Sequence, residues 1–204
     1  MPSPAKKKKI SVCLIGDSHL GALKRAYDEK MPEAVDFNVE FYGAPGPEFR
    51  AIRLTNGRLT PDESAVAAVT AVNGKGRLEV APDDFDAVLF FGSRFRTHLI
   101  FQEFLHRSLN HDDFVSAAVR QHALARFANG VRSFRNAHYF AENCNGNVFY
   151  SGAPFLTDGI KDDLFSIFPS AEKAKKSDRA ALWDEVETLF DNNGVTLIRQ
   201  PENT

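Results

Sequence analysis

Short apolar runs alternate with segments of helical periodicity along this chain. Each run is bounded by polar, glycine or proline residues, which is typical of buried strands. The predicted strands are Ile10 to Ile15, Asp36 to Tyr42, Asp86 to Phe91, Asn147 to Tyr150 and Val195 to Arg199. Strands that alternate with helices predict an α/β fold, in which helices cover both faces of a parallel sheet.

Apolar residues recur at helical spacing between several of these runs. The predicted helices are Gly21 to Met31, Asp113 to Asn136 with Gly130 as a point of interruption, and Asp178 to Asn192. The segment Ile52 to Thr60 contains an Asn-Gly pair and predicts a hairpin. A weaker extended piece lies at Arg77 to Val80. We interpret this region, between the second and third strands, as a surface insertion.

Composition indicates an ordinary globular chain. The 204 residues are 43% hydrophobic and 25% charged, with a net charge of -2, so no global basic field favours nucleic-acid binding. No apolar run approaches the ~18 residues of a membrane helix, so we expect no membrane span. Residues 1–9 are predicted to be a basic flexible tail, and residues 10–204 a single domain.

The cysteines and the basic start bear on the compartment. The apolar run after Lys6 to Lys9 is too short for a secretory signal. Cys13 lies in a predicted strand and Cys144 in a polar loop, which is neither a disulfide framework nor a metal-ligand spacing. We therefore expect a reducing compartment, a cytoplasmic location, and no metal or other cofactor.

Unusual residues follow three of the predicted strands. Residues 16–20 read Gly-Asp-Ser-His-Leu, residues 43–47 read Gly-Ala-Pro-Gly-Pro, and residues 92–96 read Gly-Ser-Arg-Phe-Arg. In an open parallel sheet, ligands bind outside the carboxyl ends of the strands. The three loops are therefore predicted to meet at one crevice.

Ser18 stands between a strand and a helix, where a tight turn exposes a hydroxyl and helix amides stabilise nearby negative charge. This placement favours a nucleophile. The alternative is that Asp17 and Ser18 are a plain helix-capping pair. The second glycine of the Gly-x-Ser-x-Gly elbow is replaced by Leu20, so this is not an α/β-hydrolase turn.

The run Val12-Cys-Leu-Ile-Gly-Asp-Ser-His-Leu20 resembles the first block of the SGNH, or GDSL-like, hydrolase superfamily. The resemblance implies a flavodoxin-like three-layer α/β/α sandwich with a five-stranded parallel sheet. The Gly-Asp-Ser-His form is similar to SGNH domains linked to acyl transfer or removal on glycans. By this resemblance Ser18 is the nucleophile and an oxyanion-hole amide, and Gly46, or less favourably Gly43, is the oxyanion glycine.

Two features depart from the superfamily pattern. Its third block is Gly-x-Asn, whereas Arg94 stands at the asparagine position here. A guanidinium also donates to an oxyanion or binds an anionic substrate group, although Arg94 can equally be a structural loop cation. The Asp-x-x-His block, which supplies the base, does not occur in these residues. We therefore expect the domain to be C-terminally incomplete.

Further residues are candidates for substrate contact. Asp17, His19 and Ser93 belong to the converging loops, and Asp158 follows the fourth strand but has a turn-residue explanation. His98 is within reach of the crevice, with a helix-start surface position as the alternative. No histidine pair with a third ligand has metal-site spacing.

These features favour a serine ester hydrolase or O-acyltransferase of the SGNH type, acting on a small-molecule or glycan acyl ester. The alternative is a catalytically silent SGNH-like module that binds a glycan or an anionic ligand. A nucleotide or phosphate binder is disfavoured because the loops lack the P-loop and Gly-x-Gly-x-x-Gly patterns.

Overall fold

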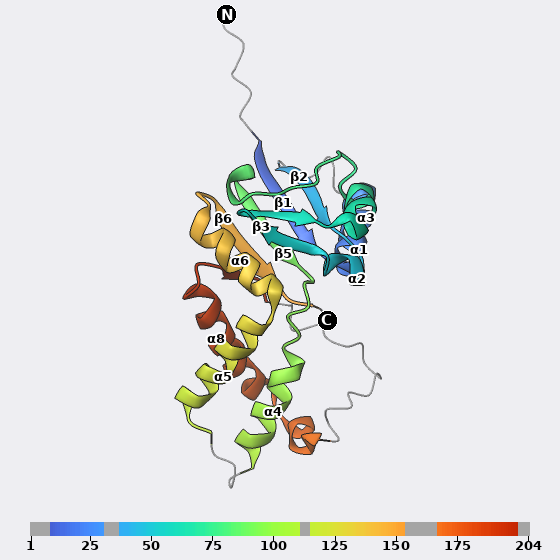
Figure 1. Ribbon diagram of the computed structural model, residues 1–204. Coiled ribbons are helices and arrows are strands. Elements are labelled where there is room, and N and C mark those ends of the chain that lie inside the picture. The colour runs from blue at the N-terminus through green and yellow to red at the C-terminus, as the bar shows by residue number, and fades with distance from the viewer. Residues whose placement is uncertain (1–8, 31–36, 111–114, 154–166, 200–204) are drawn as a thin grey trace, which may run out of the picture.

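A computed structural model describes residues 9–30, 37–110, 115–153 and 167–199 (Figure 1). Its centre is a five-stranded sheet in which every pair of neighbouring strands is parallel. The strands are β1 (Ile10–Gly16), β2 (Phe37–Gly43), β5 (Ala87–Phe91), β6 (Asn147–Ser151) and β7 (Thr196–Leu197). The predicted α/β class and all five predicted strands are confirmed.

The sheet order is β2-β1-β5-β6-β7, with β1 paired to β2 on one side and to β5 on the other. Numbered along the chain among the sheet strands, this is the flavodoxin-like order 2-1-3-4-5. The chain reverses its direction across the sheet after β2, so the topological switch point lies between β1 and β5. The loops that follow these two strands are therefore the expected place for a ligand.

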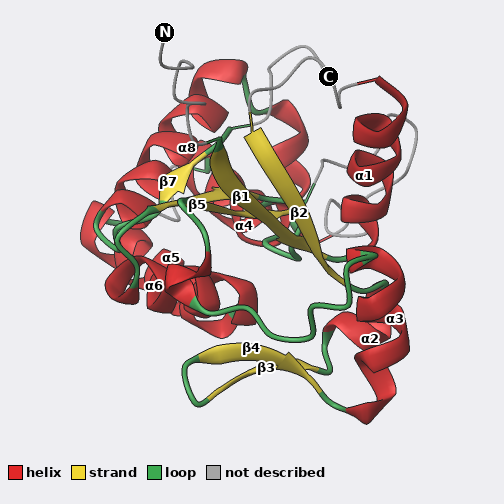
Figure 2. Ribbon diagram, turned by 90° about the horizontal axis from the view of Figure 1, so that it is seen from above, coloured by secondary structure: helices red, strands yellow, loops and turns green. Residues whose placement is uncertain are grey.

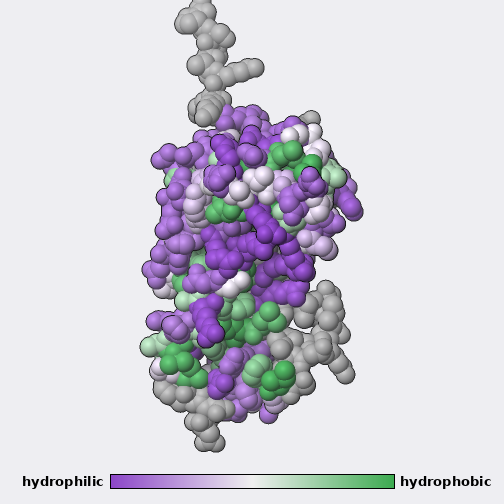
Figure 3. Space-filling view, viewed as in Figure 1, coloured by the Kyte–Doolittle hydropathy of each residue, from purple (hydrophilic) through white to green (hydrophobic). Residues whose placement is uncertain are grey.

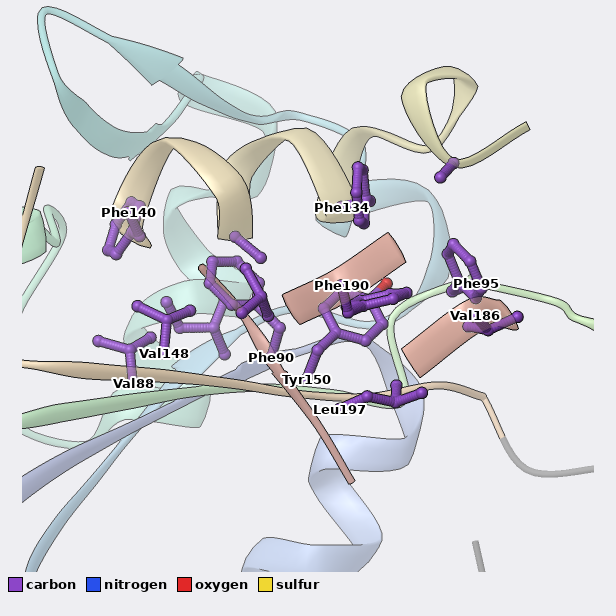
Figure 4. Close-up of a cluster of buried hydrophobic side chains, with 14 of the residues drawn as sticks. Val88, Phe90, Phe95, Phe134, Phe140, Val148, Tyr150, Val186, Phe190 and Leu197 are labelled. Atoms are coloured by element: carbon purple, nitrogen blue, oxygen red, sulfur yellow. The ribbon is translucent and has the colours of Figure 1, made fainter. Parts of the chain in front are cut away.

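Helices lie on both sides of the sheet (Figure 2). In Figure 4, α6 and α8 pack above the strands, while α1 lies below them. The longer helices are α1 (Ser18–Lys30), α3 (Glu63–Asn73), α4 (His98–Leu109), α5 (Ala117–Gly130), α6 (Arg132–Asn143) and α8 (Lys176–Asp191). Among the described residues, no helix is both long and apolar enough to cross a membrane.

The segment predicted as a long helix over Asp113 to Asn136, with Gly130 as a point of interruption, forms two helices, and residues 113 and 114 lie outside the described residues. The chain breaks at Val131, which has extended φ and ψ of -89° and 114°, so α5 and α6 are separate helices. The break follows Gly130, the predicted point of interruption, and α6 continues to Asn143. The change of direction lets Phe134 and Phe140 of α6 enter the core.

The predicted hairpin is confirmed as β3 (Ile52–Thr55) and β4 (Arg58–Pro61). Asn56 and Gly57 both have positive φ, at 52° and 79°, as a tight two-residue hairpin turn requires. Its interpretation as a surface insertion is wrong, because Ile52 and Leu59 are buried in the core. The extended piece at Arg77 to Val80 reduces to a bridge between Leu59 and Val80.

Helix α3 follows the hairpin and was not predicted as an element. It begins after Asp62, whose side chain accepts a hydrogen bond from the backbone N–H of Ser64. Ala65 and Val69 are buried residues of this helix. The helix and the hairpin together form the crossover that carries the chain from β2 to β5.

An aromatic cluster fills the space between the sheet and helices α6 and α8 (Figure 4). Phe190 of α8 lies at its centre, with ring centroids 4.9 Å from Phe134, 5.1 Å from Phe95 and 5.1 Å from Tyr150. Phe95 belongs to the loop after β5, so the core anchors one of the candidate site loops.

Candidate functional site

Glycines close the carboxyl ends of β1 and β2. A Cβ atom on Gly16 would lie 2.2 Å from the carbonyl oxygen of Phe91, and one on Gly43 would lie 1.9 Å from the carbonyl oxygen of Gly16. Any side chain at these positions would clash with backbone of the neighbouring strand. The structure therefore gives Gly43 a packing role, and the absence of side chains lets the loops start side by side at one sheet edge.

Ser18 is the first residue of α1 and its side chain is exposed. The helix begins three residues earlier than predicted, so the serine lies in the first turn. Asp17 precedes it at the capping position, where its Oδ1 accepts a long hydrogen bond, 3.4 Å, from the backbone N–H of His19. Within the described chain, no group is hydrogen-bonded to the Ser18 hydroxyl.

The loop after β5 has an unusual backbone. Gly92 and Arg94 have positive φ values of 64° and 30°, and Arg94 is one of two non-glycine residues with positive φ in the described segments. A Cβ on Gly92 would lie 2.5 Å from the Cβ of His19. His19 therefore packs directly on this loop, and the loops after β1 and β5 are in contact as predicted.

Arg94 and Asp17 join the two loops through an ion pair. Arg94 Nε lies 3.7 Å from Asp17 Oδ2, and the Asp17 side chain is only 6% exposed. The Arg94 Nε atom is inaccessible to solvent and has no hydrogen-bond partner in the described structure. The side chain as a whole is 38% exposed, so part of it is open to a ligand.

A hydrogen-bond network holds the Arg94 loop from below. The carbonyl oxygen of Ser93 lies 2.6 Å from the Tyr150 hydroxyl and 3.0 Å from Ser133 Oγ, and these two hydroxyls are 2.6 Å apart. Only two hydroxyl protons, one on Tyr150 and one on Ser133, are available for these three contacts. Burial raises the pKa of the Tyr150 hydroxyl well above its ordinary value, which keeps it protonated as a donor.

Sequence reasoning missed Ser133 and Tyr150 as supports of the site. Tyr150 was assigned only to a strand, and Ser133 lies on a helix with no motif to mark it. Ser93 itself is fully buried, and its hydroxyl donates to the carbonyl of Phe91 at 3.3 Å. Its position is therefore that of a loop support facing the protein interior.

Two further predicted residues, Gly46 and His98, each begin a helix. Gly46 is the first residue of the short helix α2 (Gly46–Phe49), with a positive φ of 26° and open space where a Cβ would stand. It comes three residues after the end of β2, at the same sheet edge as Ser18. His98 is the first residue of α4. Asp158 lies outside the described residues.

A cavity of about 320 Å³ opens beside this site. Arg94 lines it together with Ile15 at the end of β1, but Ser18 and Gly46 do not. It continues toward the hairpin and α6, a direction that sequence reasoning did not suggest.

The described parts of the chain contain no cluster of three or more His, Cys, Asp or Glu side chains that could hold a metal ion. Cys13 is buried, and burial raises the pKa of its thiol, which therefore stays protonated. The loops after β1 and β5 present the exposed Ser18 and the cations of Arg94 and Arg96. No family model, curated protein or solved structure matches the chain.

Proposed function

We propose that this protein is a serine ester hydrolase or O-acyltransferase with Ser18 as the nucleophile. The observation that carries the proposal is the position of Ser18, exposed at the start of α1 and at the switch point of a 2-1-3-4-5 parallel sheet. Arg94 supplies a cation from the adjoining loop, 3.7 Å from the neighbouring Asp17. The sequence resemblance of residues 12–20 to SGNH hydrolases supports the same assignment.

In the proposed reaction, Ser18 Oγ bonds to the acyl carbon while its proton passes to a base, and the alcohol leaves with that proton. Water, or a hydroxyl of an acceptor, then takes the acyl group and frees the serine. The oxyanion of each tetrahedral intermediate accepts hydrogen bonds from the amides of Ser18 and Gly46 and from the Arg94 guanidinium. The proposed substrate class is an acyl ester on a small molecule or a glycan.

Among the described residues, no histidine is hydrogen-bonded to Ser18, so we assign no residue as the base. A serine hydroxyl without a base is a weak nucleophile. We therefore expect slow turnover of p-nitrophenyl acetate, within the ~10³ to 10⁴-fold acceleration over water that oxyanion groups and binding alone provide. If His19→Ala or His98→Ala abolishes the activity, that histidine is the base.

Labelling with a fluorophosphonate probe tests the nucleophile. The wild-type chain is expected to incorporate the probe slowly, and Ser18→Ala is expected to abolish both labelling and p-nitrophenyl acetate hydrolysis. Ser177→Ala is the matched control, since Ser177 is also an exposed serine in the first turn of a helix, α8. Labelling that persists in Ser18→Ala would rule out the proposed nucleophile.

Arg94→Ala is expected to lower kcat/KM. The loss should correspond to ~2 to 4 kcal/mol of transition-state stabilisation, which is the scale for losing an oxyanion donor. The melting temperature should change little, because the side chain is partly exposed and its pairing with Asp17 is loose. Arg96→Ala, an exposed position two residues away, is the control. Equally small effects of both substitutions would show that Arg94 is only a loop cation.

A catalytically silent module that binds a glycan or an anionic ligand is the second candidate. The free Ser18 hydroxyl and the arginine at the place of the superfamily's asparagine favour it. In that case fluorophosphonate labelling is absent from the wild-type chain.

A further inference from the structure

Two cavities lie near the Arg94 loop, between the β3–β4 hairpin and α6. The cavity of about 320 Å³ next to Arg94 and a neighbouring one of about 580 Å³ share Arg132 and Asn136 as lining residues. The two cavities are therefore neighbours that share part of their walls, and we treat them together as one groove. Figure 3 shows hydrophilic side chains gathered over the middle of the same face.

Five arginines line this groove, which we call the arginine groove. They are Arg50, Arg53, Arg94, Arg132 and Arg135. They come from α6, from the hairpin and its preceding turn, and from the loop after β5. Since the whole chain has a net charge of -2, this concentration of positive charge is local.

The groove arginines largely lack acidic partners. In the described part of the chain, no carboxylate is ion-paired with Arg50, Arg53, Arg132 or Arg135, and Arg94 has only the loose contact with Asp17. Of the described arginines outside the groove, five are ion-paired with acidic side chains, namely Arg58, Arg77, Arg107, Arg120 and Arg199, and four are not, namely Arg25, Arg96, Arg126 and Arg179.

One acidic residue, Glu142, is found among the described residues that line the groove. Its carboxylate lies 3.5 Å from His138 Nε2 and is ion-paired with no arginine of the described groove lining. The positive charge of the groove is therefore not neutralised by the protein itself. Bringing arginines together without counter-charges costs free energy, which a bound anion would offset.

Backbone hydrogen bonds hold two of the arginines in place. Arg132 Nη1 donates to the carbonyl oxygen of Arg50, which ties α6 to the turn before the hairpin, and Arg135 Nη1 donates to the carbonyl oxygen of Asn129. Each guanidinium carries five N–H donors, so most donors remain for a ligand. Such pre-positioned guanidinium groups suit the oxygens of phosphate, sulfate and carboxylate groups.

Apolar side chains line other parts of the groove, beside the polar side chains of Asn129, Ser133, Asn136 and His138. Ile15, Phe49, Ile52 and Leu59 line its first part, and Leu54 and Tyr139 its second. The ligand that fits therefore has a compact organic framework with several anionic groups attached. A cavity of this size is typical of small-molecule sites, and the two aromatic side chains do not make the stacking platform of a single-strand nucleic-acid surface.

We propose that the arginine groove binds a small organic polyanion, such as a sugar or cyclitol that carries two or more phosphate, sulfate or carboxylate groups. The proposal does not depend on Ser18 chemistry. Arg94 borders both sites, so a bound polyanion would lie next to the Ser18 crevice.

Calorimetric titration with three probes tests the proposal and separates the sources of the anionic group. The probes are inositol hexakisphosphate, a heparin-derived hexasaccharide and a trigalacturonate. We expect at least one to bind with a Kd below about 100 µM at low salt. The affinity should fall at least tenfold in the Arg53→Ala/Arg135→Ala double variant, because each lost charge-assisted hydrogen bond weakens binding by about that factor or more.

The control is Arg58→Ala/Arg126→Ala, which removes the same charge from exposed positions on the hairpin and on α5 that do not line the groove. It should change the affinity less than twofold, and both double variants should melt near the wild-type temperature. Ser18→Ala should bind the probes like the wild type, so the outcome is independent of the esterase proposal.

Three results would overturn the proposal. They are an absence of binding by all three probes, an equal loss of affinity in the two double variants, and tighter binding of a 12-nucleotide single-stranded DNA than of any probe. The second would indicate general electrostatic attraction, and the third a nucleic-acid surface.

Discussion

Gly43→Ala is expected to lower the free energy of unfolding by about 3 kcal/mol, the upper part of the range for overpacking. The new methyl group would stand 1.9 Å from the carbonyl oxygen of Gly16 and 2.9 Å from a methyl of Leu20. The carbonyl belongs to the paired backbone of β1, opposite Gly43 in the register, so it cannot move aside as a side chain can. Urea unfolding followed by circular dichroism measures the change.

Gly21→Ala is the matched control for this substitution. Gly21 lies inside α1, and no atom stands within 4 Å of its Cβ position. Alanine there is expected to stabilise the protein by about 0.5 to 1 kcal/mol through helix propensity. If Gly43→Ala were as stable as the wild type, the close approach of β1 and β2 at the site edge would be wrong.

Phe190→Ala is expected to cost about 3 to 5 kcal/mol, the usual range for removing a buried phenylalanine. Its ring is fully buried and contacts the rings of Phe95, Phe134 and Tyr150. Two of these partners support the site, because Phe95 belongs to the Arg94 loop and Tyr150 holds the Ser93 carbonyl. Loss of the ring should therefore loosen the loop as well as the core.

The control for the core substitution is Phe37→Ala. Phe37 begins β2 and its side chain is 44% exposed, so its removal should cost less than about 1 kcal/mol. Thermal unfolding of both variants compares the two positions directly. Similar losses for Phe37 and Phe190 would contradict the assignment of the aromatic cluster as the centre of this core.

Local pattern was sufficient for the sheet and for the contact between the loops after β1 and β5. Apolar runs separated by helical segments predict parallel strands, and the polar and glycine residues at Gly16 to Leu20 and Gly92 to Arg96 mark the strand ends. Parallel strands bring their carboxyl ends to one edge, so the contact of these two loops follows from the chain order. The hairpin turn at Asn56 and Gly57 is similarly a local preference for positive φ.

The rest depends on contacts between residues far apart in the sequence, which local pattern does not contain. The separation of α5 from α6 at Val131 lets Phe134 and Phe140 reach the core, although the apolar spacing runs through the break. The roles of Gly43 and Ser93 are decided by the backbone atoms that lie against them in the folded chain.

The same difference between local pattern and tertiary contact applies to the Ser18 loop and the arginine groove. The loops that carry Ser18 and Arg94 follow strand ends, and their residues form motifs that can be read along the chain. The arginine groove is assembled from single arginines on the hairpin, its preceding turn, α6 and the loop after β5, and each is an ordinary surface cation in its own segment. Only the tertiary structure shows that they share one concave surface, on which Arg94 alone among the five has an acidic partner in the described part of the chain. Proximity across elements and the placement of counter-charges are properties of the folded molecule.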